Sequence, residues 1–192
     1  LNKRNLPWRN KSLKNSNYPY EILVSEIMLQ QTTVATVEKR YNNFLKKWPN
    51  IKKLSAESER NILKFWSGLG YYNRAVNLLK CSKIIVKKFK GKLPEDYNDL
   101  IKLPGIGKYT AEAIRGIAFN KLAMPIDTNI SRFTTRIFGI NSKKNIKQKE
   151  IEFFSKKLIY KKRPGDMIQA LMDFGSKICR KNNPKCTECI VN

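Results

Sequence analysis

Apolar residues recur at intervals of three and four along most of this chain, which is the period of an α-helix. The clearest segment runs from Tyr71 to Phe89, where Ala75, Leu78 and Ile85 fall on one face. Alternation of apolar and polar residues, which is typical of half-buried strands, is not found over any convincing length. The pattern therefore predicts an all-α fold.

Further stretches with the same period predict the remaining helices. Residues 20–47 form one such stretch, divided into two helices, and Trp48-Pro49 ends it because the residue before a proline disfavours helical dihedrals. Pro164 suits the first position of a C-terminal helix. We expect the other helices at about 61–66, 128–138, 148–160 and 164–177.

The segment from Leu103 to Thr110 separates two short helical stretches by a turn. Pro104, Gly105 and Gly107 form the turn, and we expect both glycines to adopt positive φ values, which glycine does at little cost. Their N–H groups would lie at the start of the second helix, where an anion such as a phosphate binds. The segment is typical of a helix-hairpin-helix that binds a nucleic-acid backbone, and a plain connector is the alternative.

The composition points to a polyanionic partner. The chain of 192 residues contains 39 Lys and Arg, 15 Asp and Glu and no His, with a formal net charge of +24. This charge favours nucleic acid or an acidic membrane surface, with a general habit of Lys and Asn usage as the alternative. Without His, Ser-His and Cys-His triads are excluded, so catalysis would depend on carboxylates, Lys, Tyr or Cys. No apolar run approaches the length of a membrane span, and no signal-peptide pattern is present.

Two carboxylates stand at positions that suit catalysis. Glu26 follows Ile22 by four residues and Leu23 by three, so it shares the apolar side of a predicted helix. Burial there would raise the pKa of its carboxyl group, as a general acid requires, and a Glu that faces water or pairs with lysine is the alternative. Asp127 directly precedes a predicted helix, where Asp is a common N-cap. A second carboxylate that stabilises developing positive charge is the functional alternative, and the two roles are compatible.

Three cysteines lie close together near the end of the chain. Cys179, Cys186 and Cys189 occupy a segment rich in Lys, Asn and Pro without apolar period, so we do not expect them in a core. Three thiols without His predict an iron–sulfur cluster or an all-thiolate zinc site, each of which needs a fourth ligand. Disulfides are not expected without a secretion signal. Cys81 lies on a predicted helix among apolar residues, and we expect it to fill the core.

Two further motifs place polar or aromatic side chains at the ends of helical stretches. They are Gln30-Gln31-Thr32-Thr33 and Gly70-Tyr71-Tyr72. Such side chains insert into base stacks in some DNA-binding proteins. Solvated glutamines and half-buried tyrosines are the alternative for these motifs taken alone.

Taken together, these motifs resemble those of the helix-hairpin-helix DNA glycosylase superfamily, and within it the A/G-specific adenine DNA glycosylases, which are relatives of endonuclease III. The similarity runs through nearly the whole chain. Its most specific part is Met28-Leu29-Gln30-Gln31-Thr32, and its least specific part is the hairpin. The other matching motifs are Leu6-Pro7-Trp8-Arg9, Ser25-Glu26, Gly68-Leu69-Gly70-Tyr71-Tyr72, Leu103-Pro104-Gly105-Ile106-Gly107, Gln169-Ala170-Leu171-Met172-Asp173-Phe174-Gly175 and the cysteine spacing.

The resemblance implies two helical domains with the active-site cleft between them. The first would be a six-helix domain at residues 20–128, with the helix-hairpin-helix at about 96–119. The second would combine residues 1–19 with 129–192 and end in the cysteine-rich loop. Because the chain opens at Leu1 rather than Met and stops at Asn192, we expect a piece of a longer protein that is incomplete at both ends.

The resemblance also implies base excision DNA repair by hydrolysis of the N-glycosidic bond of adenine opposite 8-oxoguanine or guanine. Glu26 would be the catalytic acid, which protonates N7 of a flipped-out adenine. Asp127 would stabilise the oxocarbenium-like sugar, or trap it transiently, before water completes the hydrolysis. Asn129 matches a family residue that supports the aspartate.

The expected partner is double-stranded DNA with a flipped adenine, bound by a monomer without a membrane. We expect a bacterial protein in the cytoplasm, associated with the nucleoid. In the family pattern, several residues occupy the gap in the duplex and contact the opposite base, namely Gln31, Thr32, Leu69 and Tyr71. Arg4, Trp8 and Arg9 match positions that line the adenine pocket. Gln30, Gly105, Gly107 and Lys108 complete the residues expected to contact DNA.

Position 109 distinguishes this chain from endonuclease III-like relatives. These relatives carry a lysine there, which attacks the sugar as a Schiff-base nucleophile. This chain has Tyr109, and a phenol cannot form an imine, so a monofunctional glycosylase is expected. Lys108 lies about 100° around the helix and is a poor substitute.

The chain departs from the adenine glycosylase pattern at three points. Thr128 stands between Asp127 and Asn129, where that family usually has Gly, so an endonuclease III-like pyrimidine or mismatch glycosylase is an alternative. A non-catalytic helix-hairpin-helix module is a further alternative. The resemblance favours a [4Fe–4S] cluster on Cys179, Cys186 and Cys189, with the fourth cysteine expected six residues after Cys189, beyond this sequence. The family's C-terminal domain, which helps to read 8-oxoguanine, is also absent, so we expect weak cluster binding and weak discrimination of the opposite base.

Overall fold

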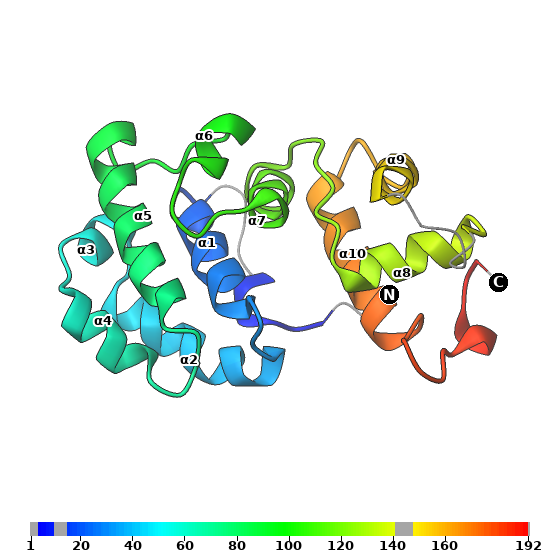
Figure 1. The fold of residues 1–192 in the computed structure, drawn as a ribbon, viewed down its shortest axis with the longest axis horizontal. Helices are drawn as coiled ribbons and strands as arrows, with labels where there is room; N and C mark the ends of the chain where they lie inside the picture. The colour runs from blue at the N-terminus through cyan, green and yellow to red at the C-terminus, as the bar shows by residue number, and fades with distance from the viewer. Residues whose placement is uncertain (1–3, 10–14, 141–147, 192) are drawn as a thin grey trace. The chain divides into compact units, whose positions relative to one another are not determined.

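The computed structural model of the protein describes residues 4–9, 15–140 and 148–191, and every regular element in these ranges is helical (Figure 1). The all-α prediction is therefore confirmed.

None of the described helices combines the length and apolar character needed to cross a membrane. The α-helices are α1 (Tyr18–Leu29), α2 (Val34–Lys47), α3 (Ile51–Ser55), α4 (Glu59–Trp66), α5 (Asn73–Phe89), α6 (Tyr97–Ile101), α7 (Lys108–Ala113), α8 (Thr128–Ile137), α9 (Gln148–Lys157) and α10 (Pro164–Lys177). Shorter elements are the 3-10 turns η1 (Pro7–Arg9) and η3 (Cys186–Glu188) and the π-helical turn η2 (Ile114–Ala118).

The chain forms two compact units. One comprises Asn5–Ile114, which we call the hairpin unit, and the other combines Leu1–Arg4 with Arg115–Asn192, which we call the cysteine unit. The sequence predicted one domain at 20–128 and a second that combines 1–19 with 129–192, whereas the compact units divide after residues 4 and 114. Gly116 and Asn120 both contact Gly165 at the start of α10, which joins the stretch after residue 114 to the cysteine unit.

The core of the hairpin unit is built around α5 and α1. The short helices α3 and α4 both pack against α5, and α1 contacts α2, α5 and α7. The predicted apolar face of α5 is buried, including Ala75, Leu78 and Ile85, and Cys81 lies with it in the core as expected. Burial raises the pKa of the Cys81 thiol to about 12.

Helix α1 is buried on all sides rather than on one face. Ten of its 12 residues are buried, and among them are the polar residues Glu21, Ser25 and Glu26. The sequence predicted burial of Glu26 from its apolar neighbours, and this is confirmed, since only 6% of its surface is exposed. Glu21 is buried equally well, so burial by itself does not single out Glu26.

Local caps set the boundaries that periodicity could not. Helix α2 begins after Thr33, whose hydroxyl accepts a hydrogen bond from the Thr36 N–H at 3.4 Å. Helix α3 begins after Asn50, whose side chain accepts from the Lys53 N–H at 3.0 Å. Helix α3 was not predicted from the sequence.

In the cysteine unit, α8 packs against both α9 and α10. Its small core contains Met124, Ile130, Phe133 and Leu171, together with Cys179. The burial of Cys179 corrects the expectation that all three clustered cysteines lie outside a core. The polar sequence around Cys179 hid this, because its apolar neighbours come from α8 and α10 rather than from its own segment.

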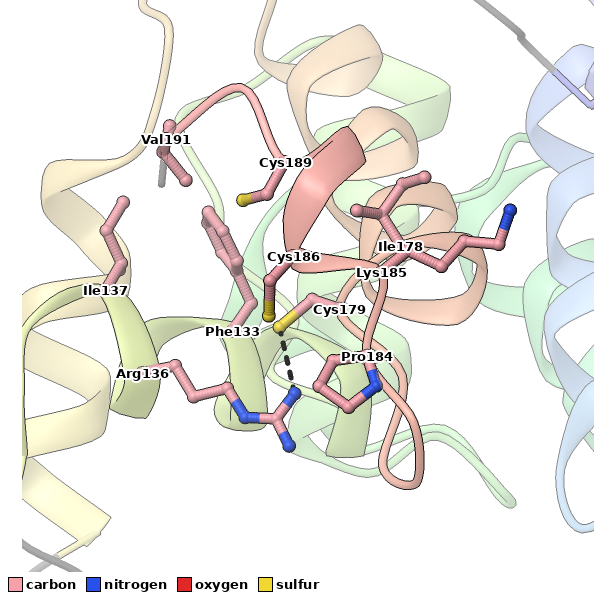
Figure 2. Close-up of a pocket in the computed structure, with 10 residues that line it drawn as sticks. All are labelled: Phe133, Arg136, Ile137, Ile178, Cys179, Pro184, Lys185, Cys186, Cys189 and Val191. Carbon is pink, nitrogen blue, oxygen red and sulfur yellow. Dashed lines mark hydrogen bonds between the residues drawn. The ribbon is translucent and has the colours of Figure 1, made fainter.

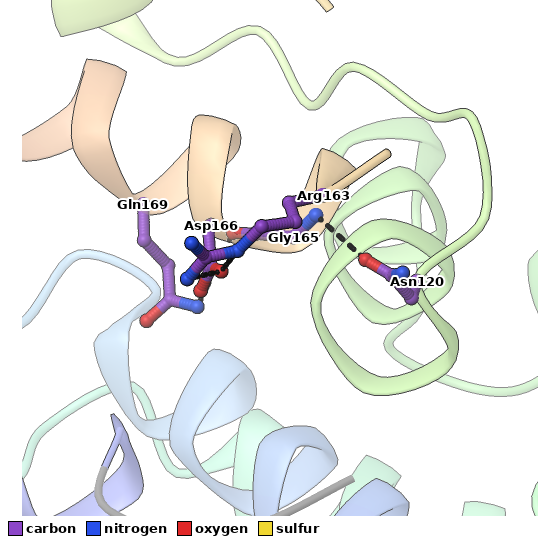
Figure 3. Close-up of polar contacts among 5 residues, drawn as sticks. All are labelled: Asn120, Arg163, Gly165, Asp166 and Gln169. Atoms are coloured by element: carbon purple, nitrogen blue, oxygen red, sulfur yellow. Dashed lines mark hydrogen bonds and ion pairs between the residues drawn. The ribbon is translucent and has the colours of Figure 1, made fainter. Parts of the chain in front are cut away.

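The start of α10 lies very close to the turn after α7. Pro164 occupies the start of α10 as predicted, and the Gly165 N–H donates to Oδ1 of Asn120 at 3.3 Å (Figure 3). A Cβ at Gly165 would lie 2.7 Å from the carbonyl oxygen of Gly116 and 3.3 Å from Cα of Ile117. Since backbone cannot move aside as a side chain can, this contact requires glycine at position 165.

We expect Gly165→Ala to lower the free energy of unfolding by about 1–3 kcal/mol, measured by urea denaturation. The added methyl group would collide with the backbone at Gly116. An unstrained helical Gly→Ala change instead raises stability by about 0.4–1 kcal/mol. A gain in stability would therefore contradict the close contact.

Candidate functional site

The hairpin between α6 and α7 has one glycine that the fold requires and one that it does not. Gly105 has φ +80°, and a Cβ there would lie 3.0 Å from Cβ of Asn77. Gly107 is the N-cap of α7 with φ −92°, and among the described residues, its two chain neighbours aside, no atom lies within 4 Å of the point where a Cβ would stand. The expectation of positive φ is confirmed for Gly105 and wrong for Gly107. Lys108 and Tyr109 follow as the first residues of α7, the lysine exposed and the tyrosine half-buried.

Gln30 connects the end of α1 to this hairpin. Its side-chain amide donates to the carbonyl oxygen of Gly105 at 3.2 Å and to Oγ1 of Thr110 at 3.2 Å. Gln30 therefore supports the hairpin from within the protein. Its contact with DNA stays a prediction.

Arg74, on the first turn of α5, joins the two motifs that the sequence predicted to insert into DNA. Its guanidinium donates to the carbonyl oxygen of Gln30 in the first loop. In the second loop it donates to the carbonyl oxygens of Leu69, at 2.8 Å, and of Gly70, at 3.0 Å. It also donates to Oγ1 of Thr32 at 2.9 Å. The Thr32 hydroxyl in turn donates to the Leu69 carbonyl at 3.3 Å, so the two loops are bonded to each other as well.

Arg74 was not among the residues predicted from the sequence, although its position carried a signal. It precedes Leu78 by four residues and therefore falls on the apolar face of α5. Arginine is almost never fully buried unless its donors are satisfied. An arginine on an apolar face thus indicates a buried set of acceptors.

The two loops line one pocket of about 640 Å³. Its lining residues are Gln30, Gln31, Tyr71, Tyr72, Asn73 and Arg74. Gln31 and Tyr71 both have left-handed backbone conformations, with φ 55° and 47°, which are uncommon for residues other than glycine. Tyr71 is 62% exposed, whereas Leu69 is buried. The pocket therefore presents an aromatic ring to solvent beside a glutamine, both on strained backbone.

The residues predicted to line the adenine pocket lie in both units. Trp8, on η1, is buried and packs edge-on against Tyr41 with ring centroids 5.4 Å apart. Arg9 ends the same turn and is half-buried. Arg4 belongs to the cysteine unit, where its N–H donates to Oδ2 of Asp173 at 3.3 Å.

Asp127 is the N-cap of α8, as its position predicted. Its Oδ1 accepts from the Ile130 N–H at 2.7 Å, and its Oδ2 accepts from the side-chain amide of Asn129 at 2.9 Å. Asn129 thus holds the carboxylate that the cap also orients, so the structural part of the two-role hypothesis is confirmed. Asp127 is half-buried.

Arg132 extends this network toward the cysteine segment. Its guanidinium donates to Oδ1 of Asn129 at 2.8 Å, to the Gly175 carbonyl at 2.6 Å and to the Cys179 carbonyl at 2.8 Å. Gly175 also packs against Asn129, since a Cβ there would lie 2.7 Å from the Asn129 Cβ. No role was predicted for Arg132 or Gly175. Their part in this network follows from the contact between α8 and α10, which distant segments of the chain form.

Cys179, Cys186 and Cys189 line a second pocket of about 270 Å³, together with Phe133 and Arg136 (Figure 2). Cys179 is buried, Cys186 is exposed and Cys189 is intermediate. The Arg136 guanidinium donates to Sγ of Cys179 at 3.4 Å, which places a positive charge beside this sulfur. The donors suit a thiophilic metal group, but the residues that the structure describes contain no set of three arranged to hold a metal ion.

Comparison with known proteins identifies relatives that are all DNA repair proteins of related kinds. Residues 24–161 match the family described as HhH-GPD superfamily base excision DNA repair protein. An adenine DNA glycosylase of Buchnera aphidicola subsp. Baizongia pistaciae is 46% identical over 97% of this chain and 52% of its own length. A structure of a thermostable thymine-DNA glycosylase has a TM-score of 0.88 and 31% identity over 99% of this chain and 86% of that one. A non-covalent endonuclease III–DNA complex has a TM-score of 0.79 and 26% identity over 90% of this chain and 80% of that one.

These matches confirm the predicted glycosylase fold. The chain spans about half the length of the Buchnera relatives it matches, two of which are 46% and 41% identical to it.

The two hairpin glycines provide a matched test of fold against DNA binding. We expect Gly105→Ala to cost about 1–2 kcal/mol of unfolding free energy, because its φ is left-handed. Gly107→Ala should change stability by less than about 0.5 kcal/mol, because its φ is ordinary and its surroundings are open. It should nevertheless weaken duplex binding severalfold, since the methyl group would stand where a phosphate is expected to approach the backbone.

Urea denaturation measures the first quantity and fluorescence anisotropy with a labelled duplex the second. Undiminished duplex binding by Gly107→Ala would contradict the assignment of the hairpin as a phosphate-binding element.

Proposed function

Because the chain belongs to the HhH-GPD superfamily of base excision DNA repair proteins, we propose that it excises adenine opposite 8-oxoguanine or guanine in double-stranded DNA. The observation that carries this proposal is the 46% identity to a protein named adenine DNA glycosylase, over 97% of the chain. The human protein of the same name is 35% identical over 98% of the chain.

Charge and surface support DNA as the partner. The net charge of +24 favours a polyanion, and neutralising phosphates releases counterions, which drives binding. Open space around Gly107 leaves room for a phosphate at the hairpin. The pocket beside Gln31 and Tyr71 offers an exposed aromatic ring for a base stack.

The proposed reaction uses two carboxyl groups. Glu26 donates a proton to N7 of the flipped adenine, and the bond between N9 and C1′ breaks with its electron pair leaving on the base. Asp127 stabilises the positive charge that develops on the sugar. Water then adds to C1′ and gives a proton to the Glu26 carboxylate, which restores the acid and leaves an abasic site and free adenine. Glu26 lies in the hairpin unit and Asp127 in the cysteine unit, so their distance in the working enzyme is part of the proposal.

The enzyme is proposed to be monofunctional. Tyr109 occupies the position where endonuclease III-like relatives carry their nucleophilic lysine, and a phenol forms no Schiff base with the sugar. Hydrolysis by water then ends the reaction without strand cleavage.

A pyrimidine or mismatch glycosylase is the second candidate. It is favoured by the likeness to a thymine-DNA glycosylase structure, which is 31% identical over 99% of this chain. Thr128 after Asp127 also resembles the endonuclease III pattern. Identifying which base is released from duplexes that differ only in one base pair separates the two candidates.

Cys179, Cys186 and Cys189 are proposed as three thiolate ligands of a [4Fe–4S] cluster, which needs one further ligand. Support comes from their shared pocket and from Arg136, whose positive charge lies beside Cys179. Such a cluster would hold the end of the chain in place around α8.

Single-turnover excision from duplexes that differ only in one base pair tests the function. We expect release of adenine opposite 8-oxoguanine and opposite guanine, and at least about a 100-fold slower rate for Glu26→Gln, which keeps the shape but loses the acid. Release of thymine or an oxidised pyrimidine without adenine would favour the second candidate. Unchanged excision by Glu26→Gln would show that another group is the acid.

Two substitutions at position 127 separate capping from chemistry. Asp127→Ser keeps a cap acceptor and should retain most of the stability, whereas Asp127→Ala should lose about 1 kcal/mol in urea denaturation. Both remove the carboxylate, and both should slow excision at least about 100-fold. If Asp127→Ser excises adenine at nearly the native rate, Asp127 caps the helix but takes no part in the chemistry.

A further inference from the structure

Arg74 has an unusually large set of acceptors for one side chain. Besides Gln30, Thr32, Leu69 and Gly70, the guanidinium donates to the carbonyls of Ile27 at 3.2 Å, Met28 at 2.8 Å and Tyr71 at 3.4 Å. Within the described residues its acceptors are thus six carbonyl oxygens and one hydroxyl, and none is a carboxylate.

These acceptors belong to three segments of the chain. Ile27 and Met28 are in the last turn of α1, where carbonyls lack partners within the helix and the helix dipole favours a cation. The others lie in the loop after α1 and in the loop before α5. Only the planar guanidinium, with five donors in a fixed fork, can serve acceptors in several directions at once.

The same bonds hold the backbone on either side of the two exposed residues of the pocket. The Gln30 carbonyl directly precedes Gln31, and the Gly70 and Tyr71 carbonyls flank the Tyr71 backbone. Gln31 and Tyr71 both have positive φ, which costs free energy and persists only where the surroundings hold it. The guanidinium carbon also lies 5.5 Å from the centroid of the Tyr71 ring.

We propose that Arg74 is a positioning residue that joins the two loops into one preformed wedge, so that Gln31 and Tyr71 enter the base stack together. The inference rests on the proposed function, since the wedge serves the opening of a duplex before excision. Without Arg74 each loop must be ordered separately when DNA binds, and that ordering consumes binding free energy otherwise available to extrude the base.

The decisive variant is Arg74→Lys, which keeps the charge but replaces the fork by a single ammonium group. Arg40→Lys is the matched control. The Arg40 guanidinium, on α2, donates a hydrogen bond at 2.8 Å to the carbonyl of Ser67, which lies in the connection between α4 and α5. Thr32→Val is a milder variant that removes the hydroxyl bonded to both Arg74 and Leu69.

Hydrogen exchange of the free protein tests the coupling without reference to activity. We expect Arg74→Lys to raise amide exchange at least about tenfold in both 30–33 and 69–73, Thr32→Val to raise it less in the same two segments, and Arg40→Lys to leave 30–33 unchanged. Faster exchange in only one of the two segments, or in neither, would overturn the proposal. If Arg74→Lys does not fold, Thr32→Val decides by the same criterion.

Base extrusion tests the consequence. In stopped-flow fluorescence with 2-aminopurine beside the target adenine, we expect Arg74→Lys to slow extrusion at least about tenfold. For adenine opposite an abasic site, less stacking opposes extrusion. On that duplex we expect Arg74→Lys to lower the excision rate clearly less than on the duplex with 8-oxoguanine. Equal losses on both duplexes would reduce Arg74 to a structural role. If the native protein releases no adenine from either duplex, the proposed function fails, while hydrogen exchange still judges the coupling of the loops.

Discussion

One buried guanidinium holds the proposed DNA-facing side of the hairpin unit together. Arg74 bonds to the end of α1, to the loop that follows it and to the loop before α5. Gln30, in the first of these loops, bonds in turn to the hairpin at Gly105. Burial of Arg74 lowers its pKa by desolvation, yet an arginine stays charged at neutral pH. The element expected to bind phosphate and the elements expected to enter the base stack therefore share one set of hydrogen bonds.

The cysteine unit uses the same kind of connection. Arg132 donates to Asn129, which holds the Asp127 carboxylate, and also to the Cys179 carbonyl. The proposed catalytic carboxylate and the cysteine segment are thus parts of one network in that unit. In both units an arginine that satisfies several backbone carbonyls fixes loops that lack regular secondary structure.

The sequence predicted those features that depend on local order. The helical period of α5, the start of α10 at Pro164 and the N-cap at Asp127 could all be read from neighbouring residues. Features that depend on distant segments could not. The buried acceptors of Arg74 come from three parts of the chain, and Cys179 is buried by α8 and α10 rather than by its own neighbours. Gly105 and Gly107 likewise differ in backbone φ, and a Cβ at Gly105 would also approach Asn77, which lies in the distant helix α5.

The proposed reaction releases adenine and leaves the DNA strand intact. Mass spectrometry of the complete reaction mixture tests both parts at once, with a duplex that pairs adenine with 8-oxoguanine and has thymine and cytosine at neighbouring positions. We expect free adenine in equal amount to an uncleaved strand with one abasic site, and no other free base. A free pyrimidine, or a strand cleaved at the abasic site by the protein itself, would contradict it.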